Sequence, residues 1–487
     1  MSASGAEVHP LVARRASGVL LHLSSLPGGH GIGDLGASAT RAVEWLALAG
    51  QRFWQMLPVG PIGAGNSPYS SPSAFAGEPL FVALDPLVRE GLLPRSALAA
   101  PKSLGRGMTQ YDAAAAFKRP RFLAAFMEFV ERGLDRGADY RSFVRRSRSW
   151  LSDWCLFAAE RDGGDVDFHA FLQYQFDRQW RALRSFAAKR GVRLIGDVPI
   201  FVGLDSADVQ AHPELFRLRR DGSPEVLTGV PPDSFSKTGQ LWGQPHYRWS
   251  VHRRNGFAWW TRRFERAMDL FDLVRIDHFI GFHNAYEVPG AAKTAERGAW
   301  KRTPGRELLS AVRRALGSLP LIAEDLGHLT PPVHALRDEF GLPGMRIVQN
   351  AFYRDGSSDL PCMHPARSVA YPGTHDNHVT SGWWRALPAD ARRRYRAYVG
   401  ATREPVWSSM LRITMQSSAN IAIVQLQDAI GLGPSSRMNL PGTPRGNWTW
   451  RAEAAMLSRS AALRLRALTT STGRLVSDAE PRRNGSR

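Results

Sequence analysis

The sequence has little cysteine and no long apolar run. Cys155 and Cys362 are the only two cysteines among 487 residues. They are too few for a disulfide framework or a cysteine metal cluster, which is typical of proteins from a reducing compartment. No hydrophobic stretch approaches the roughly 20 residues that a membrane-spanning helix needs, and the first 17 residues lack the apolar core of a signal peptide. These absences predict a cytoplasmic protein with no membrane partner.

Acidic side chains are also scarce relative to basic ones. The chain carries 63 Lys and Arg against 44 Asp and Glu, a net charge of +19. Such a balance can indicate a nucleic-acid partner, but RNA-binding signatures, zinc-finger spacing and a basic region with heptads are all absent. The densest basic groups, at 145–148 and 392–396, are typical of solvated helix faces. We therefore expect no specific nucleic-acid partner, and salt-sensitive binding to RNA or duplex is what that alternative would predict.

What the chain does contain is a series of short apolar segments of strand length. Helix-like stretches lie between several of them, for example at 38–49, 306–316 and 388–399. Alternation of strands with helices predicts a parallel sheet, and eight such units predict a closed (β/α)₈ TIM barrel of the α/β class. The eight predicted strands lie within 18–27, 52–60, 192–201, 272–279, 319–327, 344–352, 368–377 and 421–428.

Inserted segments interrupt this barrel pattern. Residues 86–191 have helical spacing and predict a largely helical subdomain between the second and third strands. Residues 229–250 hold too much Pro and Gly for a strand or helix interior, so we expect a long lid loop there. Around the barrel domain of residues 17–467 we expect an irregular arm at 1–16 and a disordered tail at 468–487.

One strand carries an unusual group of polar residues at its end. In the stretch Asp272-Leu-Val-Arg-Ile-Asp-His-Phe, Arg275 and Asp277 fall on the same strand face because side chains alternate in direction. A guanidinium beside a carboxylate favours its ionised form, and an ionised carboxylate can attack an electron-poor carbon. The alternative is a structural ion pair at a strand end.

Two further carboxylates follow other predicted strands, Glu324 and Asp376. Barrel enzymes place their sites at the strands' C-terminal ends, and breaking a glycosidic bond with retention needs one carboxylate to attack and another to protonate the leaving oxygen. The 15 Trp residues would suit a sugar site, although most Trp simply pack. A metal site is the rival interpretation. It would combine the carboxylates with His278, His375 and His378.

The sequence resembles the 4-α-glucanotransferases, also called amylomaltases or disproportionating enzymes, of glycoside hydrolase family 77. The matching blocks run from Gly18 to about Arg451. They include Val274-Arg-Ile-Asp-His-Phe and Gly373-Thr-His-Asp-Asn, together with the segments 67–71, 195–201, 229–233, 323–327 and 437–448. As a set they are far more specific than any single motif.

The resemblance implies a role for each matching residue. Asp277 corresponds to the nucleophile, Glu324 to the general acid/base, and Asp376 to the residue that stabilises the transition state. The substrate-binding residues implied in the same way are Tyr69, Asp197, Asp233, Phe235, Trp242, Arg275, His278, His375 and Asn439.

The implied activity is transfer of α-1,4-glucan segments between maltooligosaccharides, by a retaining mechanism and without a cofactor or metal. The expected partners are maltooligosaccharides and glucans derived from starch or glycogen. Two alternatives stay open. An α-amylase-like hydrolase would use the same carboxylates with water as acceptor, and a non-catalytic glucan-binding protein would bind without turnover.

Overall fold

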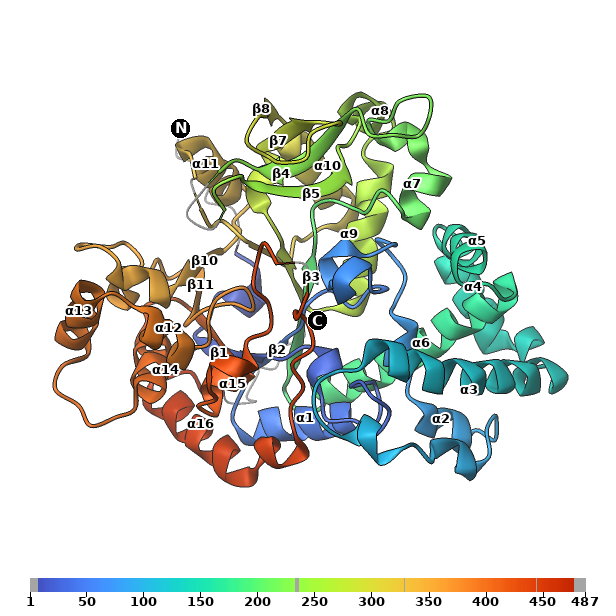
Figure 1. Ribbon diagram of the computed structural model, residues 1–487, viewed down its shortest axis with the longest axis horizontal. Coiled ribbons are helices and arrows are strands. Elements are labelled where there is room, and N and C mark those ends of the chain that lie inside the picture. Colours follow the sequence, from blue (N-terminus) through green and yellow to red (C-terminus); the bar gives the residue numbers. More distant parts are fainter. Residues whose placement is uncertain (1–7, 233–235, 328, 444, 477–487) are drawn as a thin grey trace, which may run out of the picture.

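Short apolar segments, buried on both faces, form a closed parallel barrel at the centre of the computed structural model (Figure 1). Around the barrel the strands follow the order β1, β12, β11, β10, β9, β6, β3, β2, with parallel pairing. The predicted barrel and its eight strands are confirmed. Their bounds are β1 Ala16–Leu20, β2 Phe53–Gln55, β3 Arg193–Val198, β6 Leu273–Ile276, β9 Leu321–Ala323, β10 Gly344–Ile347, β11 Ser368–Tyr371 and β12 Ile421–Gln425.

The structure describes residues 8–232, 236–327, 329–443 and 445–476. Helices surround the barrel, and α1, α10 and α13 coincide with the helix-like stretches seen in the sequence. The helices are α1 Ala37–Leu48, α2 Leu84–Arg89, α3 Tyr111–Glu131, α4 Ala138–Ser147, α5 Leu151–Asp162, α6 Val166–Ala188, α7 Ala207–Ala211, α8 Trp249–Arg254, α9 Ala258–Leu270, α10 Gly305–Leu316, α11 Pro331–Glu339, α12 Thr380–Ala386, α13 Ala389–Val399, α14 Val406–Gln416, α15 Leu426–Ala429 and α16 Arg459–Ser471. No helix in the described ranges is long and apolar enough to cross a bilayer.

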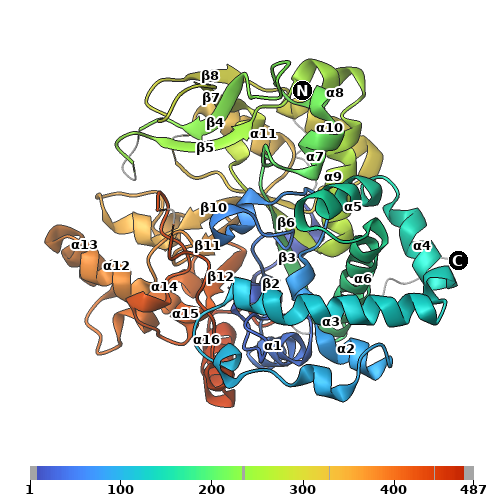
Figure 2. The same ribbon diagram turned by 45° about the vertical axis from the view of Figure 1, so that its right-hand side comes forward.

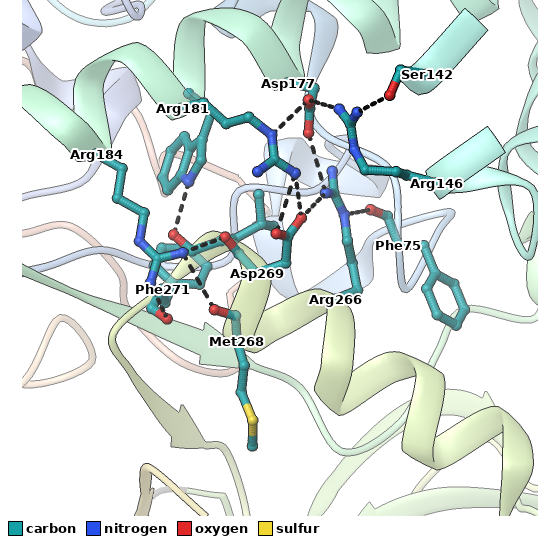
Figure 3. A network of polar contacts seen from close by, with 12 residues as sticks. Phe75, Ser142, Arg146, Asp177, Arg181, Arg184, Arg266, Met268, Asp269 and Phe271 are labelled. Carbon is teal, nitrogen blue, oxygen red and sulfur yellow. Dashed lines mark hydrogen bonds and ion pairs between the residues drawn. The ribbon is translucent and has the colours of Figure 1, made fainter. Parts of the chain in front are cut away.

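Helices α2 to α6 lie in the stretch predicted to be a helical insertion. The long helix α6 belongs also to the barrel, because its Trp180 is buried and donates a hydrogen bond to the carbonyl of Leu270, at the end of α9. An ionic network joins the same two helices (Figure 3). In it, Arg181 of α6 contacts Asp177 at 2.8 Å and Asp269 of α9 at 3.0 Å. The insertion is therefore fixed to the barrel wall that precedes β6.

A second sheet lies over one end of the barrel (Figures 1 and 2). Its antiparallel order is β5, β4, β7, β8, with bounds β4 Val226–Val230, β5 Gln240–Pro245, β7 Asn284–Pro289 and β8 Ala299–Arg302. The prediction that 229–250 is all loop is wrong, since β5 and α8 fall inside it. Pro245 is tolerated because it ends an edge strand. At Gly229 a Cβ would lie 2.4 Å from the carbonyl oxygen of Gln240, so glycine permits this strand pairing.

The predicted start of a disordered tail at 468 is also wrong. Helix α16 continues to Ser471, and Arg474 beyond it is fully buried. Its guanidinium donates hydrogen bonds to main-chain carbonyls, among them those of Ala16 at 3.0 Å and Ser417 at 2.8 Å. These bonds fix the segment beside β1. Residues 477–487 lie outside the described ranges.

Candidate active site

Arg275 lies at the centre of the polar cluster at the barrel's C-terminal end. Its Nη1 donates to both carboxylate oxygens of Asp197, at 2.8 and 2.6 Å, and its Nη2 contacts Oδ1 of Asp277 at 2.9 Å. Arg275 and Asp197 are buried, whereas the Asp277 side chain is 30% exposed. The predicted shared face of Arg275 and Asp277 is confirmed. The guanidinium holds the orientation of a carboxylate that opens toward solvent.

Glu324 follows β9 and lies beside this cluster. Its Oε2 accepts a hydrogen bond of 2.7 Å from the backbone N–H of His278. That N–H can reach Glu324 because His278 has a left-handed backbone, with φ of 54°. Burial raises the pKa of Glu324 to about 8. The charge of Asp277 adds to this rise, and that of Arg275 opposes it. Glu324 therefore holds a proton at neutral pH.

Tyr69 connects the Arg275 cluster to the end of β11. Its hydroxyl donates to Oδ2 of Asp197 at 2.7 Å and lies 3.0 Å from Nε2 of His375. The rings of Tyr69 and His375 stack with centroids 5.3 Å apart and an interplanar angle of 11°. Burial raises the pKa of Asp197 to about 7, against the opposing effect of Arg275, and it lowers the pKa of His375. His375 is thus neutral near pH 7.

Asp376 completes the row of carboxylates. Its Oδ1 lies 3.5 Å from Nε2 of His375 and accepts a hydrogen bond of 2.6 Å from Nδ2 of Asn439. The guanidinium of Arg437 donates to its main-chain carbonyl at 2.6 Å. The Asp376 side chain is 44% exposed, so it is held from behind and open toward solvent.

Trp242 of β5 brings the second sheet to the same place. Its ring meets the ring of His278 edge to face, with centroids 4.8 Å apart, and it is only partly buried. Burial lowers the pKa of His278 to about 4, so that ring is neutral at pH 7. Of the predicted site residues, Asp233 and Phe235 lie outside the described ranges. The structure brings the other ten together through the contacts given above.

The rival metal interpretation finds no ligand set here. In the described part of the chain, no three His, Cys, Asp or Glu side chains are grouped as metal ligands would be. His378, one of its proposed ligands, contacts Nη1 of Arg437 at 3.0 Å through its Nε2.

Sequence reasoning did not single out two side chains that contact the cluster, Arg437 and Trp448. Arg437 supports Asp376, and the ring of Trp448 lies against those of Tyr69 and His375. Both belong to the 437–448 segment from which Asn439 was taken. That shared segment is the signal that could have identified them.

Comparison with known proteins gives consistent results. A family model described as 4-alpha-glucanotransferase matches residues 21–165 and 158–457. The chain is 43% identical over 501 residues to the 4-alpha-glucanotransferase of Thermus thermophilus, covering 95% of this chain and 99% of that one. It is 42% identical over 478 residues to the 4-alpha-glucanotransferase of a Synechocystis strain, covering 91% and 94%.

Among solved structures, the chain is similar to an amylomaltase from Streptococcus agalactiae in complex with acarbose. The TM-score is 0.90 at 34% identity, over 95% of this chain and 100% of that chain. An amylomaltase from Corynebacterium glutamicum shares the fold, with a TM-score of 0.76 at 18% identity over 94% of this chain and 75% of that one. Because the family model and relatives above 40% identity extend over most of its length, the chain belongs to the 4-alpha-glucanotransferase family, glycoside hydrolase family 77.

Proposed function

We propose that this protein transfers α-1,4-glucan segments between maltooligosaccharides by a retaining double displacement. The observation that carries the proposal is the pairing of two carboxyl groups in different protonation environments. Asp277 contacts the guanidinium of Arg275, whereas burial raises the pKa of Glu324 to about 8. An attacking carboxylate and a neighbouring acid are what such a reaction requires.

In the first step an Asp277 oxygen attacks the anomeric carbon of the donor sugar. The bond from that carbon to the glycosidic oxygen breaks, and Glu324 gives its proton to the departing oxygen. In the second step the 4-hydroxyl of an acceptor glucan loses its proton to Glu324, and its oxygen displaces Asp277. Two inversions at the anomeric carbon restore the α linkage, and the mechanism needs no cofactor.

The remaining polar groups serve binding and charge stabilisation in this proposal. Asp376, held by Asn439 at 2.6 Å, accepts hydrogen bonds from sugar hydroxyls and stabilises positive charge on the anomeric carbon as the bond breaks. Tyr69 and the neutral His375 form one wall for the reacting sugar. The proposed substrates are maltooligosaccharides and glucans derived from starch or glycogen, and a cytoplasmic location stays a prediction.

Incubating the purified protein with maltotriose tests the proposal. Transfer predicts a ladder of oligosaccharides both shorter and longer than the substrate, with little net gain in reducing ends. Steady release of reducing ends without longer products would make the protein a hydrolase. Tight glucan binding with no turnover would make it a binding protein.

Trp242 is proposed as an acceptor platform that favours transfer over hydrolysis. Water and a glucan hydroxyl lose their proton to the same base, so binding of the acceptor must decide between them. Trp242 is only partly buried and stands beside His278. Trp242→Ala should therefore raise the ratio of hydrolysis to transfer severalfold at fixed maltotriose concentration. Equal loss of both reactions would make Trp242 a packing residue.

Removal of metal ions should leave transfer unchanged, because the proposed chemistry uses carboxyl groups alone. We expect the rate with maltotriose to stay within about twofold after dialysis against a strong chelator. Loss of activity that returns on addition of zinc or calcium would favour the metal interpretation of His375 and Asp376 instead.

A further inference from the structure

Trp448 has a backbone conformation that bulky residues rarely adopt. Its φ is 65°, in the left-handed region, and its side chain is only 7% exposed. Only glycine enters this region without steric cost, and a large side chain persists there when its surroundings hold it in place. Such an outlier beside a proposed active site calls for an explanation in terms of its contacts.

The ring of Trp448 contacts the wall of the proposed sugar site. Its centroid lies 5.7 Å from that of Tyr69 and 5.9 Å from that of His375, at interplanar angles of 44° and 42°. Tyr69 and His375 in turn contact Asp197 at 2.7 Å and Asp376 at 3.5 Å. One indole therefore supports the two rings that connect with Asp197, the carboxylate shared with Arg275, and with Asp376.

The backbone of Trp448 is held on both sides. Its N–H donates to the carbonyl of Met438 at 2.8 Å, and its carbonyl accepts a hydrogen bond of 2.7 Å from the hydroxyl of Tyr111. Tyr111 is the first residue of α3, in the helical insertion. Two further bonds join the same segments: the N–H of Thr109 donates to the carbonyl of Thr449 at 2.7 Å, and Nε of Arg451 donates to the carbonyl of Gly107 at 3.0 Å.

We infer that Trp448 is a positioning residue for the transfer reaction and that the start of α3, through Tyr111, holds it in its left-handed conformation. The inference rests on the proposed function. It assigns a task to the helical insertion, whose first helix reaches the rear of the site although it touches none of the three carboxylates in the described contacts. Small displacements of groups that orient a substrate reduce the rate of reaction more than they weaken binding.

Three substitutions at one position separate the ring from the backbone. Trp448→Gly relieves the positive φ and Trp448→Ala does not, so the Gly variant should melt at the higher temperature. Both lack the ring, so both should lose kcat for maltotriose by about tenfold or more, with KM changed far less. Trp448→Phe keeps a ring and should recover most of kcat. If kcat instead follows the melting temperature across the three variants, or stays at the wild-type value in Ala and Gly, the inference is overturned.

The role of the insertion is tested by a matched pair of variants. Tyr111→Phe removes the hydroxyl that binds the Trp448 carbonyl and should lower kcat severalfold. Tyr140→Phe makes the same chemical change in α4 of the same insertion. The Tyr140 ring packs on Phe129 and Tyr174, away from Trp448, and its variant should keep the wild-type kcat. Equal kcat values in the two variants would overturn the link.

The same experiment distinguishes the inference from the function on which it rests. A wild-type protein that makes no ladder from maltotriose would contradict the proposed function. An active wild type with unaffected Trp448 variants would contradict only the inference.

Discussion

Replacing Asp277 with Asn should lower the rate of glucan transfer by about 10³-fold or more while leaving glucan binding nearly intact. The substitution keeps the shape of the side chain but removes the negative oxygen that would attack the anomeric carbon. The contact with Nη2 of Arg275 at 2.9 Å can persist through the amide oxygen. Steady-state kinetics with maltotriose and calorimetric binding of a longer maltooligosaccharide measure the two effects.

A matched control lies at the other end of the same strand. Asp272 directly precedes β6 and accepts a hydrogen bond of 2.8 Å from the N–H of Leu194. Asp272→Asn makes the same chemical change about five residues from Asp277 and far from the row of carboxylates, so transfer should stay within about twofold. An Asp277→Asn protein that is folded and as active as this control would mean that Asp277 is a structural ion-pair partner.

Replacing Glu324 with Gln should remove the proton that the leaving oxygen needs, with a loss of at least about 10²-fold on maltotriose. A donor such as an α-maltosyl fluoride, whose leaving group departs without protonation, should recover much of the lost first step. If the fluoride and maltotriose suffer equally, Glu324 has some other task.

The wild-type pH profile follows from the same residue. Because burial raises the pKa of Glu324 to about 8, its acid form is present below that pH and is lost as the pH rises through it. Activity on maltotriose should therefore fall on the alkaline side near pH 8, rather than near the ordinary value for a glutamic acid. With the fluoride donor this alkaline loss should weaken. A profile that falls near the ordinary value for both donors would contradict the assignment.

Much of the fold could be predicted because the barrel strands are short apolar runs bounded by polar ends. Val274 and Ile276 are buried in β6, and Asp277 follows directly. Parallel strands of a closed barrel all end at the same side. Three carboxylates on three strand ends were therefore expected to come together before any contact was known.

The second sheet and the chain end could not be predicted by the same reasoning. Gly229 and Pro245 argue against a strand in isolation, and only the close approach of the Gln240 carbonyl and the edge position of β5 reverse that argument. Arg474 has no apolar pattern around it that predicts burial, and its partners are carbonyls from distant segments. Trp448 shows the same limit within the site, because a positive φ leaves no mark in a single sequence.

The most direct test of the account is to look for a bond between Asp277 and the sugar. An α-maltosyl fluoride given to the Glu324→Gln protein should allow the first step and stall the second, because no base remains to activate an acceptor. After acid quenching, mass spectrometry of the intact chain should show the added mass of one maltosyl group, and peptide mapping should place it on Asp277. An unmodified chain despite rapid release of fluoride, or a sugar attached to any other residue, would contradict the double displacement proposed here.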